Sequence, residues 1–329
     1  MVELSVSSRL PSAITVAFKR IRDMVMQGDL AKTTPVHILL EPGTYRETLK
    51  YNLSNPLILE CTAKNADCII QADNCEAFHR GLENRSVFFL GANATSVTLR
   101  NFSIINTHNK SANSNEFLDS AEALVWANEN GTLFAENLRL EGRQNTLCAK
   151  GTAHFLNCTI SGDTDFIYGE PTAVLFEKCQ IIVREDNRAN QAFVVKSLAL
   201  AGKTGFVFSD CNFSSEIRGT NQVYLYRTAG NGSADTKKDW DSAAFINCTV
   251  SDSFDQSFAW DDDLVLNIYP RGNAKTGLRE YGTKIRTNNG TILEADTTLR
   301  NIKFYTLTDD DYYKFYASRY LILQGTPLE

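Results

Sequence analysis

The sequence predicts an all-β protein: a right-handed parallel β-helix built as a single-stranded solenoid, with an N-terminal helical cap and a C-terminal extension packing on the solenoid. Three observations favour this fold class. A four-residue strand pattern recurs along the chain, a second short strand precedes several copies, and the intervals between copies are uneven. In a β-solenoid, equivalent residues of successive coils stack along one axis, while the loops between strands vary in length.

The first predicted element is an amphipathic helix. Its apolar residues recur at helical spacing and follow Ser12, which is a suitable N-cap residue; they are Ile14, Ala17, Phe18, Ile21 and Val25. We expect this helix to cover one end of the hydrophobic core.

The recurring strand pattern alternates polar and apolar residues, which is typical of a strand with one buried face. Its copies begin at Asn101, Asn137, Asn157, Lys178, Asp210 and Asn247. The second residue of each copy should point inward, giving an interior column of Phe102, Leu138, Cys158, Cys179, Cys211 and Cys248. Repeating units of about 20–40 residues are typical of solenoids.

The cysteines of this column are predicted to be reduced, buried thiols, since free cysteine is among the most frequently buried residues. A disulfide between neighbours in the column would also be geometrically possible. We make no pairing prediction for Cys61, Cys68, Cys75 or Cys148. No CxxC pair or Cys/His cluster with zinc spacing occurs, so we do not expect a metal site.

Composition limits the partners and the location of the chain. It has 329 residues, a net charge of −6 and a pI of about 5.4, which argues against a nucleic-acid partner. No apolar run approaches the roughly 20 residues of a membrane-spanning helix, and residues 1–10 lack the pattern of a secretory signal. We expect one domain over residues 1–329, acting as a monomer, either cytoplasmic or with a signal already removed.

Two acidic runs and an aromatic stretch lie toward the C-terminus. The runs 261–263 and 309–311 are interpreted as solvated loop charges, because neither has the spacing of a calcium-binding loop. The stretch from Tyr312 to Tyr320 is predicted to form a helix that packs back on the solenoid and covers its exposed end.

Two segments carry residues suited to chemistry, and they lie about one coil apart. They are Gly142-Arg-Gln-Asn-Thr-Leu147 and Gly162-Asp-Thr-Asp-Phe-Ile-Tyr-Gly169. Their side chains should face each other on neighbouring coils. Asp165 follows a turn and precedes an apolar patch, where a fixed carboxylate can act as a nucleophile or base. The alternative is that Asp165 simply forms the turn.

These segments resemble motifs of the pectin methylesterase (pectinesterase) family. The family's Gly-x-Tyr-x-Glu is matched by Gly43-Thr-Tyr-Arg-Glu47, and Gln-Asp-Thr-Leu by Gln144-Asn-Thr-Leu147 with one change. Gly-x-Val-Asp-Phe-Ile-Phe-Gly is matched by Gly162 to Gly169, and Gly-Phe-Val-Phe before a cysteine by Gly205 to Phe208 and Cys211. Where the family has Leu-Gly-Arg-Pro-Trp, this chain has Leu225-Tyr-Arg-Thr-Ala229. The order of the motifs agrees from about residue 10 to 290.

The resemblance implies a right-handed parallel β-helix that hydrolyses methyl esters of galacturonan, with a polysaccharide or oligosaccharide substrate, no cofactor and usually a secreted location. It implies that Asp165 attacks the ester carbonyl and that Arg227 orients this carboxylate. It also implies that Gln144 helps to hold the oxyanion.

The chain departs from the family at two positions of the predicted site. The family's general acid, the Asp of Gln-Asp-Thr-Leu, is replaced by Asn145, and a second oxyanion-stabilising Gln is replaced by Glu122. Two independent losses would give an inactive protein. Because an acid became an amide and an amide became an acid, we favour an exchange of roles, with Glu122 as acid/base and Asn145 as an oxyanion donor.

Aromatic residues near the predicted site are candidates for sugar binding. The family's Trp after Arg-Pro is replaced by Ala229, and Trp260 resembles a second aromatic position of the family. Tyr226 and Tyr168 are further candidates for substrate binding, unless they are packing residues. Two other functions stay open: a carbohydrate-binding β-helix without catalysis, and an esterase for a different acyl substrate.

Overall fold

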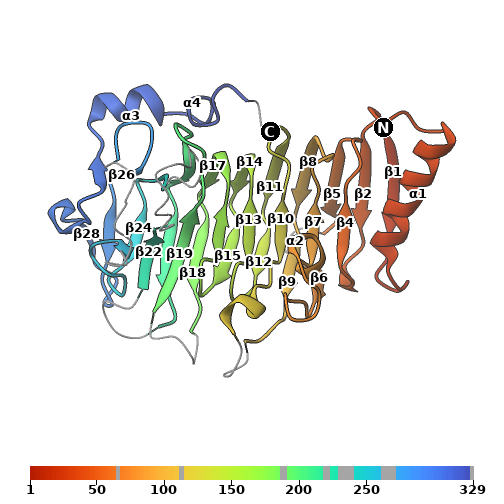
Figure 1. Cartoon of the computed structure of the whole chain (residues 1–329), viewed down its shortest axis with the longest axis horizontal. Coiled ribbons are helices and arrows are strands. Elements are labelled where there is room, and N and C mark those ends of the chain that lie inside the picture. Colours follow the sequence, from red (N-terminus) through yellow and green to blue (C-terminus); the bar gives the residue numbers. More distant parts are fainter. Residues whose placement is uncertain are drawn as a thin grey trace.

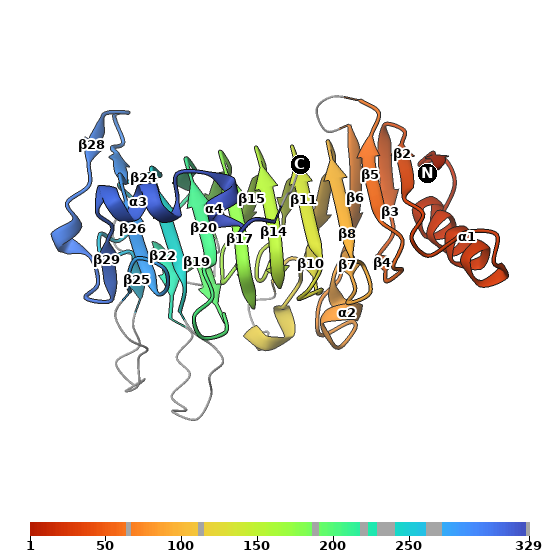
Figure 2. The ribbon, with the colours of Figure 1, turned by 90° about the horizontal axis from the view of Figure 1, so that it is seen from above.

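The chain winds into three sheets of 11, 8 and 10 strands, which form the faces of a parallel β-helix (Figure 1). The computed structural model describes residues 1–63, 67–110, 115–185, 191–217, 223–228, 241–260 and 272–326. Among these residues every strand pairing is parallel except that of β27 with β28. Seen from above, the coils follow one another along a single axis (Figure 2). The predicted parallel β-helix is therefore confirmed.

From β2 to β25, each coil contributes one strand to each sheet. The 11-stranded sheet contains β1 (Val2–Val6), β2 (Val36–Leu40), β5 (Leu57–Cys61), β8 (Ser96–Arg100), β11 (Thr132–Glu136), β14 (Gly151–Leu156), β17 (Pro171–Glu177), β20 (Gly205–Ser209), β23 (Ala243–Ile246), β26 (Leu278–Tyr281) and β29 (Phe304–Thr306). The 8-stranded sheet contains β4 (Leu49–Tyr51), β7 (Phe88–Leu90), β10 (Leu124–Trp126), β13 (Leu147–Ala149), β16 (Ile167–Gly169), β19 (Ala192–Ser197), β22 (Val223–Arg227) and β25 (Ala259–Trp260). The 10-stranded sheet contains β3 (Gly43–Arg46), β6 (Cys68–Ala72), β9 (Ser103–Asn106), β12 (Arg139–Glu141), β15 (Thr159–Gly162), β18 (Gln180–Val183), β21 (Asn212–Ser215), β24 (Thr249–Ser251), β27 (Lys284–Arg286) and β28 (Ile292–Glu294).

The first residue of every repeat copy makes the sharp turn between the 11-stranded and 10-stranded sheets. All six have a left-handed backbone conformation, with φ between 51° at Asn247 and 63° at Asn101. Asn and Asp tolerate this conformation better than most side chains, which explains why five of the six are Asn or Asp. Gly282, with φ of 62°, makes the same turn in the next coil.

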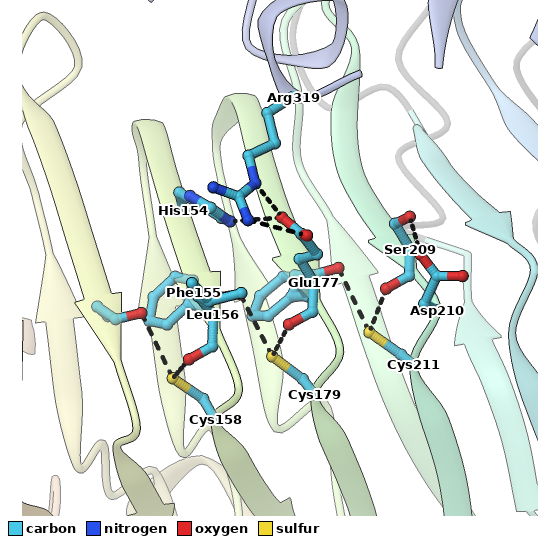
Figure 3. A network of polar contacts seen from close by, with 12 residues as sticks. His154, Phe155, Leu156, Cys158, Glu177, Cys179, Ser209, Asp210, Cys211 and Arg319 are labelled. Carbon is cyan, nitrogen blue, oxygen red and sulfur yellow. Dashed lines mark hydrogen bonds and ion pairs between the residues drawn. The ribbon is translucent and has the colours of Figure 1, made fainter. Parts of the chain in front are cut away.

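The residue after each turn points into the core, as predicted. Cys158, Cys179, Cys211 and Cys248 are free and buried, and each thiol lies 3.3–3.6 Å from carbonyl oxygens, one of them on the preceding coil. Figure 3 shows the first three of these thiols. A ladder of stacked phenyl rings runs beside them: Phe155, Phe176, Phe208 and Phe245. The prediction of reduced thiols is confirmed at all four positions, and Cys61 forms a disulfide with Cys68.

Helix α1 (Ala13–Gln27) caps the first coil and buries the predicted apolar face. The predicted N-cap is wrong in one respect. Ser12 stands at the N-cap position, but its backbone is left-handed, with φ of 51°, and its side chain makes no capping hydrogen bond. The carboxylate of Glu47 accepts from the backbone N–H groups of Ile14 at 3.1 Å and Thr15 at 2.9 Å instead. An anion at a helix N-terminus is stabilised by the unpaired N–H groups and the helix dipole.

The C-terminal residues pack on the side of the solenoid and not over its end, so that part of the prediction is wrong. Helices α3 (Asp309–Phe315) and α4 (Arg319–Ile322) lie along the outer face of the 11-stranded sheet (Figure 1). That face carries a stripe of apolar residues, and the C-terminal residues bury this stripe. The stripe and the residues that bury it are Leu175, Val207, Ala244, Ile246, Leu307, Tyr316, Ile322 and Leu323.

The acidic run 309–311 forms the first turn of α3, with a capping box between Thr308 and Asp311, and is not a loop. The run 261–263 lies outside the described residues. The remaining short helical turns are α2 (Leu82–Arg85), η1 (Glu116–Asp119) and η2 (Thr297–Leu299).

An ionic contact at the protein surface ties α4 to the sheet. Arg319 Nη2 donates to Glu177 Oε1 at 3.1 Å, and His154 Nε2 lies 3.1 Å from Glu177 Oε2 (Figure 3). The hydrogen bond with His154 and the charge of Arg319 outweigh the effect of burial and lower the pKa of Glu177 to about 2.

This contact predicts a stability loss at low pH. The folded pKa of Glu177 lies below its ordinary value of 4.5, so the contact stabilises the fold above pH 4.5 and is lost as the pH falls toward 2. The free energy of unfolding should therefore fall over this range in the wild type, by about 1 kcal/mol or less because Arg319 is half exposed to solvent. Urea unfolding of Glu177→Gln should lack this component, whereas Glu294→Gln, an exposed control, should retain it. If the free energy of unfolding depends on pH equally in wild type and Glu177→Gln, Glu177 is not the group responsible.

Candidate active site

The two segments that carry the predicted chemistry lie on consecutive coils, as expected. Gln144 forms a parallel bridge with Thr164, and the backbone N–H of Asn145 donates to the carbonyl of Thr164 at 3.0 Å. Further along, Cys148 pairs with Tyr168 as β13 meets β16. This register places Asn145 beside Asp165.

Glu122 occupies the equivalent position on the coil before. Leu124 pairs with Leu147, and the N–H of Ala123 donates to the carbonyl of Thr146 at 2.8 Å. Glu122, Asn145 and Asp165 therefore stand in one file across three coils, which we call the acid–amide file. Strands in a sheet lie about 4.8 Å apart, so the backbones of Glu122 and Asp165 are separated by roughly two such spacings.

Two members of the acid–amide file have a left-handed backbone. The φ angles are 64° at Asn145 and 45° at Asp165. Non-glycine residues in this region are sparsely populated and cluster at functional sites. Both residues lie in the turns that precede strands β13 and β16.

Asp165 is held by two cations. Its Oδ2 accepts from Arg227 Nη1 at 3.1 Å and lies 3.8 Å from Lys196 Nζ. The guanidinium of Arg227 lies 5.0 Å from the ring centroid of Phe193 and 5.7 Å from that of Trp260, and such cation–π contacts fix its direction. The pairing of Asp165 with Arg227 agrees with the prediction. Lys196 was not predicted, although its pairing with Tyr168 places it at the site.

The two amides of the predicted oxyanion site lie on the coil before Asp165. Gln144 pairs with Thr164, and Asn145 stands next to Asp165 in the same register. Gln144 is almost completely buried, and Asn145 is partly exposed. The Nδ2 of Asn145 donates to Ser120 Oγ at 3.2 Å, which ties the Asn145 side chain to the end of η1.

Glu122 lies in a dense ionic cluster. It has no exposed surface. Arg85 Nε donates to Oε2 at 2.8 Å and Arg85 Nη2 to Oε1 at 2.6 Å, while the hydroxyl of Tyr168 also donates to Oε1. Arg85 Nη1 donates in addition to Glu76 Oε2 at 2.8 Å. We call Glu76, Arg85, Glu122 and Tyr168 the Glu122 cluster.

The pKa shifts in this cluster follow from burial and charge. Burial opposes the Arg85 cation, but the hydrogen bonds and charge of Glu122 outweigh it and raise the pKa of Arg85. Burial, together with Cys148 and Glu122, raises the pKa of Tyr168 well above its ordinary value. Burial also raises the pKa of Cys148 to about 12, so this thiol stays protonated and is a poor nucleophile.

A second buried ion pair supports the turn before Asp165. Lys110 Nζ contacts the carboxylate of Asp163 and donates to Thr164 Oγ1 at 3.0 Å. Both charged side chains are nearly inaccessible to solvent. Neither was predicted, because Asp163 stands at a variable position of the motif and Lys110 lies far away in sequence.

The three aromatic candidates for sugar binding differ in placement. Trp260 is partly exposed on β25 and contacts Phe193 with ring centroids 5.4 Å apart. Tyr168 is partly exposed, with its hydroxyl on Glu122. Tyr226 is fully buried, and its hydroxyl donates to Asp241 Oδ1 at 3.0 Å, so its ring offers no surface to a sugar and we do not retain it as a binding residue. Ala229 lies outside the described residues.

Within the described ranges, no group of three or more His, Cys, Asp or Glu side chains is placed to hold a metal ion. Over the same residues, every helix is too short or too polar to cross a membrane.

Comparison with solved structures shows that this fold is shared with pectin methylesterases. A pectin methylesterase from Yersinia enterocolitica matches 93% of this chain and 99% of its own, with a TM-score of 0.70 and 21% identity. A pectin methylesterase solved in complex with a hexasaccharide matches 93% of both chains, with a TM-score of 0.67 and 19% identity.

The sequence comparisons give the family. The family model described as Pectinesterase matches residues 12–266, and the chain belongs to this family. Curated relatives include a probable pectinesterase/pectinesterase inhibitor of Arabidopsis thaliana, 29% identical over 56% of this chain, and a probable pectinesterase A of Aspergillus niger, 27% identical over 60%. The matched part spans only 26% of the plant relative and 58% of the fungal one.

The Glu122 cluster predicts a large stability effect. Arg85→Met leaves the buried carboxylate of Glu122 without its cation, which should lower the free energy of unfolding by about 3–5 kcal/mol in urea titrations. Adding Glu122→Gln should recover part of this loss, since the uncompensated charge is then removed. Arg100→Met, which breaks the more exposed pair with Glu136, is the control and should cost about 1 kcal/mol or less. An Arg85→Met loss no larger than the control's would contradict the assignment.

Proposed function

We propose that this chain hydrolyses methyl esters of methylesterified galacturonan, the pectin polymer, or of its oligomers. The observation that carries the proposal is Asp165, a nearly buried carboxylate bound to Arg227 and placed in register with an amide and a second acid. Membership of the pectinesterase family supports the reaction, and the hexasaccharide complex of a related esterase supports the class of substrate.

In the first step, Asp165 attacks the ester carbonyl and forms an acyl-enzyme. Arg227 holds the attacking carboxylate through one oxygen, with Lys196 nearby. The negative charge that develops on the carbonyl oxygen needs donors fixed in advance. The side-chain amides of Gln144 and Asn145 are suited to this role, and Ser120 fixes the orientation of Asn145.

Glu122 takes the acid/base role that the family assigns to the position of Asn145. It supplies the proton that the departing methoxy group needs, and then accepts a proton from the water that hydrolyses the acyl-enzyme. Asn145 in turn takes the oxyanion role that the family assigns to the position of Glu122. Two acids and two amides are thus retained, with the places of one acid and one amide exchanged.

A second function, carbohydrate binding without catalysis, is favoured by one observation. Both oxygens of Glu122 accept hydrogen bonds from Arg85, and the side chain has no exposed surface. Methanol release separates the two functions. The wild type should release methanol from esterified pectin or from short esterified oligomers, and binding of these ligands without methanol release would support the second function.

Asp165→Asn tests the nucleophile. The amide keeps the shape of the side chain and tolerates the left-handed backbone, so the fold and melting temperature should change little. Methanol release should fall by at least about 10³-fold, because no group remains to form the acyl-enzyme. Asp210→Asn is the matched control. Asp210 also has a left-handed backbone, with φ of 55°, but it lies in the turn between the 11-stranded and 10-stranded sheets. Comparable turnover in Asp165→Asn and wild type would remove Asp165 from the mechanism.

The exchanged pair is tested by changing both residues. Glu122→Gln should lower kcat by about 10²-fold or more, because the acid/base group is lost. Glu122→Gln combined with Asn145→Asp restores the family's arrangement and should recover part of the rate. In a protein that had merely lost its acid, Asn145→Asp alone would raise the activity. An unchanged rate in Glu122→Gln would overturn the exchange of roles.

A further inference from the structure

The Glu122 cluster raises a question that the proposed function leaves open. Glu122 is two coils from Asp165, whereas the family's acid would stand one coil away, at position 145. The Glu122 carboxylate also has no exposed surface, and donors occupy both of its oxygens. A proton that leaves or reaches this carboxylate must therefore pass through one of its hydrogen-bond partners.

Tyr168 is the partner suited to carry that proton. It lies on the same coil as Asp165, three residues further along, and its hydroxyl donates to Glu122 Oε1. It is partly exposed, unlike Glu122, and it pairs in register with Lys196, whose Nζ lies 3.8 Å from Asp165 Oδ2. The other partner, Arg85, remains a cation at all ordinary pH values and cannot shuttle protons.

The hydroxyl is also a departure from the family motif. Where the motif reads Asp-Phe-Ile-Phe-Gly, this chain reads Asp165-Phe-Ile-Tyr-Gly169. The change from Phe to Tyr adds one oxygen, and in the structure that oxygen contacts the acid that has changed place. A phenyl ring would be sufficient to pack against a sugar, so the hydroxyl calls for an explanation of its own.

We propose that Tyr168 is a catalytic residue, a proton relay between Glu122 and the reacting ester. This inference rests on the proposed function. In acylation, the bond between the carbonyl carbon and the methoxy oxygen breaks. The methoxy oxygen takes the Tyr168 hydroxyl proton while Tyr168 takes the proton of Glu122, which gives methanol, neutral Tyr168 and the Glu122 carboxylate.

Deacylation runs the relay in reverse. Water attacks the acyl carbon and gives one proton to the oxygen of Tyr168, whose own proton passes to Glu122. The bond from the acyl carbon to the Asp165 oxygen breaks, releasing the galacturonic acid unit and restoring the Asp165 carboxylate and protonated Glu122. One ester and one water become one acid and one methanol.

The surroundings of the relay agree with these steps. Arg85 pairs with both oxygens of the Glu122 carboxylate, so it stabilises the anion that forms when Glu122 has given up its proton; Arg85 is a positioning residue. The raised pKa of Tyr168 keeps its hydroxyl neutral, as a relay requires.

Tyr168→Phe is the decisive variant, because it removes the hydroxyl and keeps the ring. With methylesterified oligogalacturonides as substrate, kcat should fall by about 10²-fold while KM stays within about twofold. Tyr281→Phe is the matched control: it removes a hydroxyl that donates to the carboxylate of Asp309, far from the site, and should leave both constants unchanged. If Tyr168 only packs against the sugar, Tyr168→Phe will turn over as fast as wild type, and the relay is overturned.

The double variant of Tyr168→Phe with Glu122→Gln distinguishes a relay from a structural effect. Two residues on one proton path lose their function together, so the double variant should be about as slow as the slower single variant. Rate losses that multiply would overturn the relay. A wild type that releases no methanol would overturn the proposed function itself, whereas an active wild type with an equally active Tyr168→Phe would overturn the relay alone.

Discussion

Parallel stacking in register is the constraint on which the rest of this structure depends. Each coil must present its backbone N–H and C=O groups directly to the next, because a parallel sheet leaves no other partner for them. The turns must therefore recur at the same place, and the left-handed residues from Asn101 to Asn247 show that they do. Once the backbone is in register, residues at equivalent positions share one environment. The column from Cys158 to Cys248 is the apolar consequence, and the acid–amide file is the polar one.

Stacking polar residues in the acid–amide file brings charges close together, and cations from other coils balance them. Like charges one strand spacing apart repel strongly where water is excluded. Arg85 reaches Glu122 from the short helix α2, and Arg227 reaches Asp165 from two strands further along the same sheet. An amide at the central position also separates the two acids of the file. The candidate site is therefore assembled from residues between 76 and 260, although Glu122, Asn145 and Asp165 come from three consecutive coils.

The features that could be predicted from the sequence are those that repeat or that match a family motif. The strand pattern around Cys158 predicted the solenoid because each coil imposes the same alternation, and the motif around Asp165 predicted its pairing with Arg227. Arg85 and Lys110 were missed because a buried cation is selected by its partner in space, which local sequence does not encode. The burial of Tyr226 could not be predicted from its local sequence. Its neighbours Leu225 and Arg227 do not form an alternating pattern that would distinguish an inward-pointing ring from an outward-pointing one. The C-terminal helices were predicted, but their position depends on an apolar stripe assembled from four residues on three strands.

The energetics of the Glu122 cluster bear on whether the altered site works. Burying a carboxylate and a guanidinium is costly, and replacing such a pair by apolar residues is often neutral or stabilising. Stability therefore gives no reason for an acid at position 122. An amide at this position, as in the family, would need no cation to balance it. The chain nevertheless provides Glu122 with a bidentate arginine and a tyrosine hydroxyl, and provides Arg85 with a second acid, Glu76. The proposed acid/base role of Glu122 uses these same contacts, because Arg85 stabilises the anion and the Tyr168 hydroxyl gives a hydrogen-bond path to it.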